Sequence, residues 1–184
     1  MSMKWKRPVM AIGLFVLGLF AMSTAFADNK ARIEANVSET LTQFYAQHAK
    51  NKDLAGKAKG MLIFPKITKG GVGVGGAYGQ GVLQVDGKTV GYYTITSGSV
   101  GLTLGMASRS EIIMFMTQES LDKFTASNGW KVGVDAGVAL VSLGTGGQYD
   151  TETLQQPILG FVFGEKGLIG DLSFQGSKIT KNEV

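Results

Sequence analysis

The stretch that decides the fold of this 184-residue chain is KGGVGVGGAYGQGVLQVDGKT, residues 69–89. Its glycines alternate with residues that favour strands and do not cluster with serine and proline. This pattern is typical of closely packed strands rather than of a disordered linker. The pair Asp86-Gly87 predicts a tight hairpin turn between a strand that ends at Val85 and a second strand over Thr89–Thr96.

Two parts of this stretch imitate nucleotide-binding loops. Residues 71–76 match G-x-G-x-x-G, but they continue into Ala77-Tyr78-Gly79-Gln80-Gly81, a strand and turn pattern where a dinucleotide site needs a helix. Gly87-Lys88-Thr89 resembles the end of a phosphate-binding loop, but the position that must then be glycine is Val82. Strands and a hairpin explain both motifs, so we expect no nucleotide and no other cofactor.

Outward from this stretch, the spacing of apolar residues predicts helices on either side of a meander of strands. An amphipathic helix is expected over 29–50 and a shorter one over 52–59. A third helix is expected over 118–127, capped by Thr117, with Leu121 and Phe124 facing inward. Strands are predicted over 61–64, where Pro65 ends the run, and over 72–78, 82–85, 99–106, 112–117 and 131–143. A loop is expected over 144–147, and a hairpin around 165–167 joins strands over 158–163 and 168–174. The sequence therefore predicts an α+β fold, with a mainly antiparallel, barrel-like sheet against which an N-terminal amphipathic helix and a second short helix pack.

The first 27 residues have the pattern of a secretory signal peptide. Lys4, Lys6 and Arg7 precede an apolar stretch over 9–22, and Ala25-Phe26-Ala27 provides a small-x-small cleavage site. The apolar stretch is shorter than the ~20 residues that a spanning helix needs. We expect cleavage after Ala27 on the general secretory route, which leaves one domain over 28–184 in the periplasm or outside the cell. The chain has no cysteine, so we expect neither a lipoprotein nor disulfides.

Charge is concentrated in one segment of the expected mature domain. The chain carries 18 basic and 14 acidic residues, but three of the basic ones lie in the leader, so the mature part is close to neutral and nucleic acid is not an expected partner. Residues 50–69 depart from this balance. They contain one acidic residue, Asp53, and these lysines: Lys50, Lys52, Lys57, Lys59, Lys66 and Lys69. Such a segment predicts either peripheral contact with an anionic membrane or a merely soluble helix and turn.

In the membrane interpretation, Lys57, Lys59, Lys66 and Lys69 meet lipid phosphates, each contributing about 1 kcal/mol. The flanking Phe64 and Ile67 are then the candidates for contact with the acyl region. Tyr78 and Trp130 are either core aromatic residues of the sheet or a further apolar contact for a lipid chain.

Catalytic constellations are absent from the sequence. There is no G-x-S-x-G motif, no cysteine nucleophile and one histidine, His48, on the apolar face of the first predicted helix. No pattern with metal-ligand spacing occurs either. We therefore expect neither an enzyme nor a metal protein.

Several separate motifs, in order, carry a resemblance to a known family. They are Lys57-Ala58-Lys59-Gly60, Ile63-Phe64-Pro65-Lys66, residues 69–76, Gly91-Tyr92-Tyr93, Ser99-Val100-Gly101, residues 120–124, Gly129-Trp130, Gly133-Val134-Asp135, residues 160–164 and Gly176-Ser177-Lys178-Ile179. Over about residues 30–180 the chain resembles the bacterial branch of the SYLF domain family.

The resemblance implies a lipid-binding domain rather than an enzyme, with anionic phospholipid or another envelope lipid as the ligand. Eukaryotic relatives bind phosphoinositides, and a yeast branch binds actin and carries an SH3 domain. The eukaryotic relatives have other residues at the positions where this chain has Tyr92-Tyr93-Thr94 and Thr103. The chain also shows no SH3-like extension. Actin binding and a phosphoinositide preference are therefore not expected. Two alternatives stay open: an envelope adaptor that binds another protein, and a carrier that encloses an apolar ligand.

Cleavage of the leader gives the first testable prediction. Because the small-x-small site ends at Ala27, the protein recovered from the producing cell should begin at Asp28. Intact-mass measurement of the purified protein checks this, and a mass that still includes residues 1–27 would contradict it.

Overall fold

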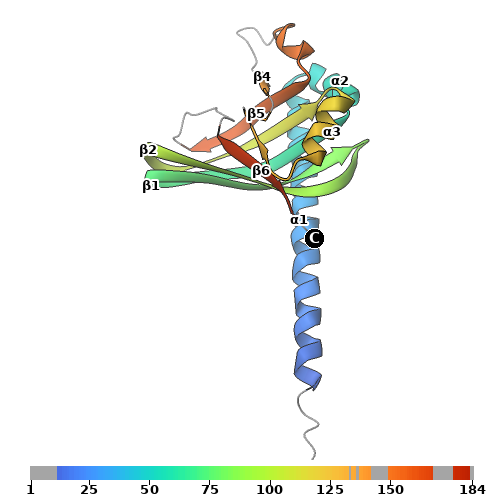
Figure 1. The fold of residues 1–184 in the computed structure, drawn as a ribbon, viewed down its shortest axis with the longest axis vertical. Coiled ribbons are helices and arrows are strands. Elements are labelled where there is room, and N and C mark those ends of the chain that lie inside the picture. The colour runs from blue at the N-terminus through green and yellow to red at the C-terminus, as the bar shows by residue number, and fades with distance from the viewer. Residues whose placement is uncertain (1–11, 133, 136, 142–148, 168–175, 183–184) are drawn as a thin grey trace, which may run out of the picture.

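The structure, a computed structural model, describes residues 12–132, 134–135, 137–141, 149–167 and 176–182. Its helices are α1 (Ile12–Gln47), α2 (Lys50–Lys57), α3 (Gln118–Ala126) and the short 3-10 helix η1 (Thr153–Gln155). Its strands are β1 (Gly60–Val85), β2 (Lys88–Phe115), β3 (Trp130–Lys131), β4 (Ala139–Val141), β5 (Ile158–Gly167) and β6 (Ser177–Lys181). The described strands form one sheet that is antiparallel except for the β4–β5 pair, so the α+β prediction is confirmed (Figure 1).

The hairpin of β1 and β2 is the centre of the sheet. Asp86 and Gly87 both have positive φ, 50° and 71°, as the expected tight turn requires. From this turn the two strands pair as far as Gly60 and Phe115, with register shifts at 64–67, 72–74 and 83–84. The shorter strands that the sequence predicts within 61–115 are therefore parts of two long ones, and the strand predicted over 112–117 ends at Phe115.

Pro65 does not end its strand, because a β-bulge accommodates it. Phe64 pairs with Glu111 and Ile67 with Arg109, so Pro65 and Lys66 together lie opposite Ser110. Proline has no N–H for the ladder, and the bulge removes the need for one. The Ser110 hydroxyl donates a hydrogen bond to the Pro65 carbonyl at 2.8 Å.

Both long strands double back on themselves, as Figure 1 shows at the end where β1 and β2 are labelled. The returning part of β1 lies directly against the outgoing part. A Cβ on Gly81 would collide with the Ile63 carbonyl oxygen and lie 2.6 Å from Cδ1 of Phe64. A Cβ on Gly79 would lie 2.7 Å from Cγ1 of Ile67 and 2.9 Å from the Lys66 carbonyl oxygen. Only glycine permits this approach, which explains the AYGQG part of the sequence.

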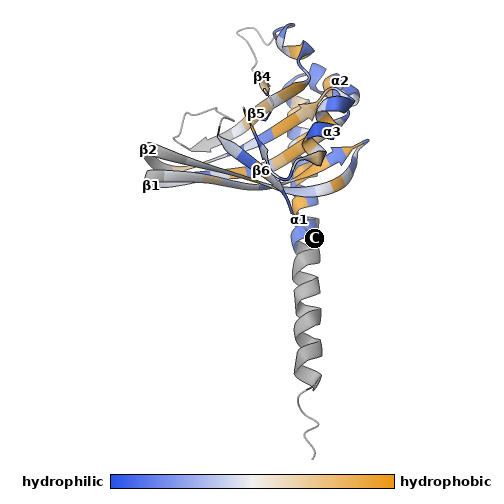
Figure 2. Ribbon diagram, in the orientation of Figure 1, coloured by the Kyte–Doolittle hydropathy of each residue, from blue (hydrophilic) through white to orange (hydrophobic). Residues whose placement is uncertain are grey.

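The rest of the described sheet is built on the other edge of β2. Residues 93–97 pair with β6, which continues to β3, and residues 107–115 pair with β5, which continues to β4. Alternate residues then face two separate cores, and Figure 2 shows the hydrophobic colouring gathered on the strands beneath the helices.

One core lies under α1 and α2. Its buried members are Ile33, Val37, Phe44, Leu54, Met61, Ile63, Val82, Ile112, Met114, Val141, Tyr149, Leu159, Phe161 and Phe163. The ring of Phe44 packs edge-on against Phe161 with centroids 4.9 Å apart. Asn51 joins α2 to this layer, since its amide donates to the Phe44 carbonyl at 2.7 Å and its oxygen accepts from the Tyr149 hydroxyl. The first predicted helix is therefore confirmed over 29–47, while α1 itself begins earlier, at Ile12.

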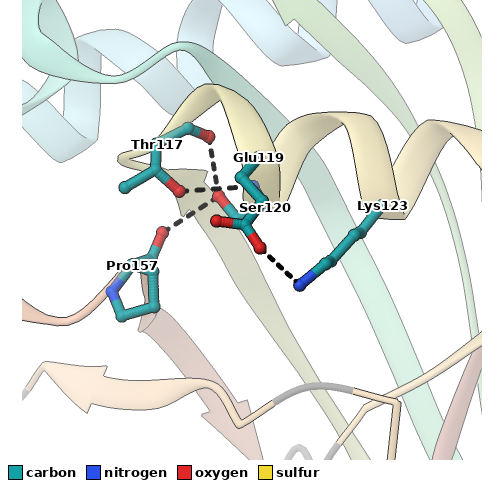
Figure 3. A network of polar contacts seen from close by, with 5 residues as sticks. All are labelled: Thr117, Glu119, Ser120, Lys123 and Pro157. Carbon is teal, nitrogen blue, oxygen red and sulfur yellow. Dashed lines mark hydrogen bonds and ion pairs between the residues drawn. The ribbon is translucent and has the colours of Figure 1, made fainter.

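The other core lies under α3. Thr117 caps this helix as predicted, accepting a hydrogen bond from the Ser120 N–H at 3.2 Å. The Ser120 hydroxyl lies 2.8 Å from the Thr117 carbonyl and 3.2 Å from the Pro157 carbonyl (Figure 3). Leu121 and Phe124 are buried as predicted, and Phe124 packs against Phe115 and Trp130. Trp130 is thus a core residue and only 3% exposed.

The predicted strand over 131–143 is interrupted soon after it begins. The backbone N–H groups of Val134 and Asp135 both donate to the Lys131 carbonyl, and the Asp135 carboxylate accepts from the Lys131 N–H. This turn leaves only β3 before it and β4 after it. The predicted turn at 165–167 is instead the end of β5. The predicted loop over 144–147 and strand over 168–174 lie outside the described residues.

The glycine contact gives a prediction about stability. Gly81→Ala should lower the free energy of unfolding by about 1–3 kcal/mol, because the new Cβ overlaps the backbone of Ile63. Gly98→Ala is the matched control on β2, since nothing lies within 4 Å of its added Cβ. Urea denaturation measures both, and equal destabilisation by the two variants would contradict the packing argument.

Candidate functional site

The four lysines predicted to meet lipid lie in two separate pairs. Lys57 is the last residue of α2, Lys59 directly precedes β1, and both are exposed. Lys66 and Lys69 lie within β1, where Lys66 is exposed and Lys69 half-buried. At about 3.3 Å per strand residue, Lys66 is roughly 23 Å from Lys59. The basic cluster of the sequence is therefore not one surface patch.

Phe64 and Ile67, the residues expected to touch acyl chains, are buried. They are 0% and 2% exposed and belong to the core under α3. The bulge at Pro65 and Lys66 explains this, because it turns both side chains toward the same face of the sheet. These two residues are therefore unavailable at the surface, and any apolar contact with lipid must come from elsewhere.

Lys66 and Tyr78 do come together, in a hollow of about 340 Å³ between α1 and β1. Tyr78 is 53% exposed and is the more accessible of the two predicted aromatic residues. The hollow also contains a residue that sequence reasoning missed, Arg32 of α1, whose Nη2 donates to Asn29 at 3.0 Å. We call this feature the Arg32–Lys66 hollow; its other lining residues are Ile33, Asn36, Pro65, Thr68, Gly79 and Gln80.

The chemistry of the Arg32–Lys66 hollow suits an oxyanion. It is lined by two cationic side chains, by hydroxyl and amide groups, and by no carboxylate. A guanidinium and an ammonium group that face one space are a common arrangement for binding phosphate. The only sequence signal for Arg32 was its place on the polar face of an amphipathic helix, which says nothing of what lies opposite.

A second hollow of about 270 Å³ adjoins the first and shares Asn36, Pro65 and Lys66 with it. Glu39 and Gln43 of α1 line one side, and Ser110 lines the other. Arg109 lines it too, so this second hollow has two cations and one carboxylate, and that carboxylate makes it less favourable for an anion than the first.

A larger groove of about 1010 Å³ lies where α1, the turn end of β2, the end of α3 and the end of β6 meet, and Lys30 and Lys181 line it without a carboxylate. Beside it, Glu34 ties α1 to the hairpin by accepting from the Tyr92 hydroxyl at 3.0 Å and from the Thr89 hydroxyl at 3.1 Å. Burial raises the pKa of Tyr92, and the hydrogen bond and charge of Glu34 raise it further. Lys30 lies over the Tyr92 ring, 5.3 Å from its centre. These contacts fix the position of α1 on the sheet.

Glu111 is the one described acidic side chain buried in the sheet. It accepts from Nε of Arg109 at 2.6 Å, and its second oxygen, Oε2, has no hydrogen-bond partner. Burial raises the pKa of Glu111, and the adjacent Arg109 charge opposes that rise only in part. Glu111 lines neither hollow, and its register partner Phe64 belongs to the core under α3, so the buried carboxyl group bears on stability.

His48 has a structural environment. It is half-buried, its ring lies 4.6 Å from that of Tyr149, and its Nδ1 accepts from the Lys50 N–H at 3.1 Å. In the described part of the chain no three His, Cys, Asp or Glu side chains gather closely enough to hold a metal ion. No helix among the described residues has the length and apolar character to cross a membrane.

The fold and the site thus define an α+β domain with a mainly antiparallel sheet, helices on both faces and a basic hollow beside its first helix. Residues 96–183 match the family model Ysc84, described as Las17-binding protein actin regulator. The matched segment covers most of β2, α3 and the strands up to β6, and it confirms the resemblance to the SYLF family that the motifs indicate. Among curated proteins, no sequence matches this chain.

Glu111 gives a prediction about pH. A carboxyl group whose pKa is raised on folding adds stability below its unfolded pKa and loses that contribution as pH rises through its folded value. Wild type should therefore lose stability relative to Glu111→Gln as pH rises from about 4 to 8, since glutamine does not titrate. Melting temperatures across this range test the difference in slope, and parallel curves for the two proteins would contradict it.

Proposed function

We propose that this protein is a non-enzymatic lipid-binding domain of the cell envelope that contacts anionic phospholipid at a membrane surface. The observation that carries the proposal is the Arg32–Lys66 hollow, a surface space with two cations, several hydrogen-bond donors and no carboxylate in its lining. The family resemblance supports the same class of ligand.

The charges set the expected strength of binding. A lysine or arginine near an anionic bilayer contributes about 1 kcal/mol, and screening limits that attraction to about 10 Å. The two cations of the hollow share one phosphate-sized space, while Lys57 and Lys59 lie on exposed surface at another place. Binding should therefore be weak, sensitive to salt and dominated by the hollow.

A surface site is favoured over a carrier that encloses its ligand. The described hollows are open and mixed in polarity, while the apolar side chains of the described sheet fill two packed cores. An envelope adaptor that binds a protein is the remaining alternative. Export to the periplasm after cleavage at Ala27 is part of the proposal, and it makes actin and nucleic acid unsuitable partners.

Two charge-matched double variants test the proposal. Arg32→Ala/Lys66→Ala removes both positive charges from the lining of the hollow. Lys57→Ala/Lys59→Ala removes two positive charges from the exposed surface near α2. Co-sedimentation with vesicles of phosphatidylglycerol and phosphatidylcholine should show about thirtyfold weaker binding for the first variant, from roughly 2 kcal/mol of lost attraction. The second variant should lose clearly less.

Vesicles of phosphatidylcholine alone should bind neither variant nor wild type. Equal loss in the two variants would show that net charge, not the hollow, is responsible. Absence of wild-type binding to anionic vesicles would overturn the lipid proposal, and capture of a specific protein partner without lipid would favour the adaptor.

A further inference from the structure

The groove of about 1010 Å³ at the turn end of β2 plays no part in the proposed function. Its walls come from α1, the start of β2, the end of α3 and the end of β6. It is about three times as large as the Arg32–Lys66 hollow of 340 Å³, and the two spaces share no lining residue. We call this space the Lys30–Lys181 groove after the two cations in its lining.

The groove and the hollow lie on opposite flanks of α1. This helix packs on the sheet through a buried stripe that includes Ile33 and Val37. At 3.6 residues per turn, Lys30 lies on one flank of the stripe, and Arg32 is about 200° farther around the helix, on the other flank. The Lys30–Lys181 groove is therefore a separate site and not an extension of the hollow.

The two lysines of the groove approach neighbouring residues of β2. Lys30 Nζ lies 5.3 Å from the centre of the Tyr92 ring. The stem of Lys181 passes Gly91, where an added Cβ would lie 3.6 Å from Lys181 Cε. In the part of the chain that the structure describes, neither ammonium group forms an ion pair with a carboxylate, and no carboxylate lines the groove. Both charges are thus available to an anion in the same space.

The carboxylate of Glu34, four residues after Lys30, is directed to two hydroxyl groups. It accepts from the Tyr92 hydroxyl at 3.0 Å and from the Thr89 hydroxyl at 3.1 Å. Glu34 does not line the groove, whereas Tyr92 and Thr89 do. Because both hydroxyl protons are donated to Glu34, the two oxygens are left to accept hydrogen bonds from a ligand.

The remaining polar lining consists of hydroxyl and amide side chains. They are Thr125, Ser127, Asn128, Thr180 and Asn182. Asn182 is held in place, since its N–H donates to the Tyr92 carbonyl at 2.9 Å and its side-chain oxygen accepts from the Thr94 hydroxyl at 2.9 Å. Hydroxyl and amide groups donate and accept, whereas an ammonium group only donates. A lining that combines both kinds complements a ligand with an acidic group and several hydroxyl groups.

We propose that the Lys30–Lys181 groove binds a phosphate-bearing polyol, the unit found in sugar phosphates and glycerol phosphates. The two ammonium groups bind the phosphate as point charges, and the hydroxyl and amide lining binds the hydroxyl groups. A bare phosphate fills only a small part of this volume and leaves most of the hydroxyl and amide lining unused. The same chemistry applies to a free molecule and to the end of a lipid or polymer.

Titration with glucose 6-phosphate and with glycerol 3-phosphate tests the site. In ¹⁵N-labelled protein, the backbone amide signals of Gly91, Asn128 and Thr180 should shift together as either probe is added. Glucose and inorganic phosphate, which each supply only part of the ligand, should bind there about tenfold more weakly or less. If neither phosphorylated probe shifts these three signals, the proposal is wrong.

Three variants assign the binding to the groove. Lys30→Ala/Lys181→Ala should weaken binding of glucose 6-phosphate about tenfold, because both charge-assisted contacts are lost. Thr180→Trp keeps both lysines and places a large ring in the groove, so it should weaken binding at least as much. Lys57→Ala/Lys59→Ala, the charge-matched control near α2, should change binding by less than about twofold. Unchanged melting temperatures show that all three variants are folded.

Equal weakening by the control and by Lys30→Ala/Lys181→Ala would show that net charge is responsible and would overturn the site. Undiminished binding by Thr180→Trp would also overturn it.

Phosphatidylglycerol vesicles distinguish the two sources of the ligand. If Lys30→Ala/Lys181→Ala sediments with these vesicles as wild type does, while losing glucose 6-phosphate, the groove takes a free ligand. If it loses both, the groove takes the headgroup of a lipid. Failure of wild type to bind any vesicle would overturn the proposed function but not this inference, which depends on the phosphorylated probes alone.

Discussion

The contact on which the described sheet depends is the approach of Gly79 and Gly81 to the backbone of residues 63–67. It holds the returning half of β1 against the outgoing half, and β2 follows because it pairs with β1 from Lys88 to Phe115, apart from three register shifts. A side chain at either glycine would separate the two halves and with them the layers that face α1 and α3. The glycine content that first looks like a nucleotide loop is therefore a requirement of packing.

The bulge at Pro65 and Lys66 decides which side chains of this segment face water. It places Phe64 and Ile67 in one core and leaves Lys66 exposed beside α1. A related irregularity occurs on the other side of β2, where Arg109 lies opposite two residues of β5 and Gly164 adopts a positive φ of 66°. The two irregularities lie at the same level of the sheet, where the buried Glu111 pairs with Arg109.

The functional proposals follow from how these constraints distribute charge and apolar surface. The lysines divide into an exposed pair near α2 and a second pair in β1, and of these Lys66 lines a hollow with another cation, Arg32, and the exposed Tyr78. The functional proposal therefore rests on the Arg32–Lys66 hollow, whose cationic and hydrogen-bonding lining suits the phosphate of an anionic lipid.

The sequence by itself determined the α+β class, the Asp86-Gly87 turn, the helix over 29–47 and the helix that Thr117 caps, because each rests on local periodicity or turn chemistry. Its family motifs indicated the resemblance that the match over 96–183 confirms. Only the tertiary structure decided that Pro65 sits in a bulge within a long strand, that Phe64, Ile67 and Trp130 are buried, and that Arg32 lies beside Lys66. These features depend on contacts between segments distant in the chain, and no local pattern specifies which residues a doubled strand will bring together.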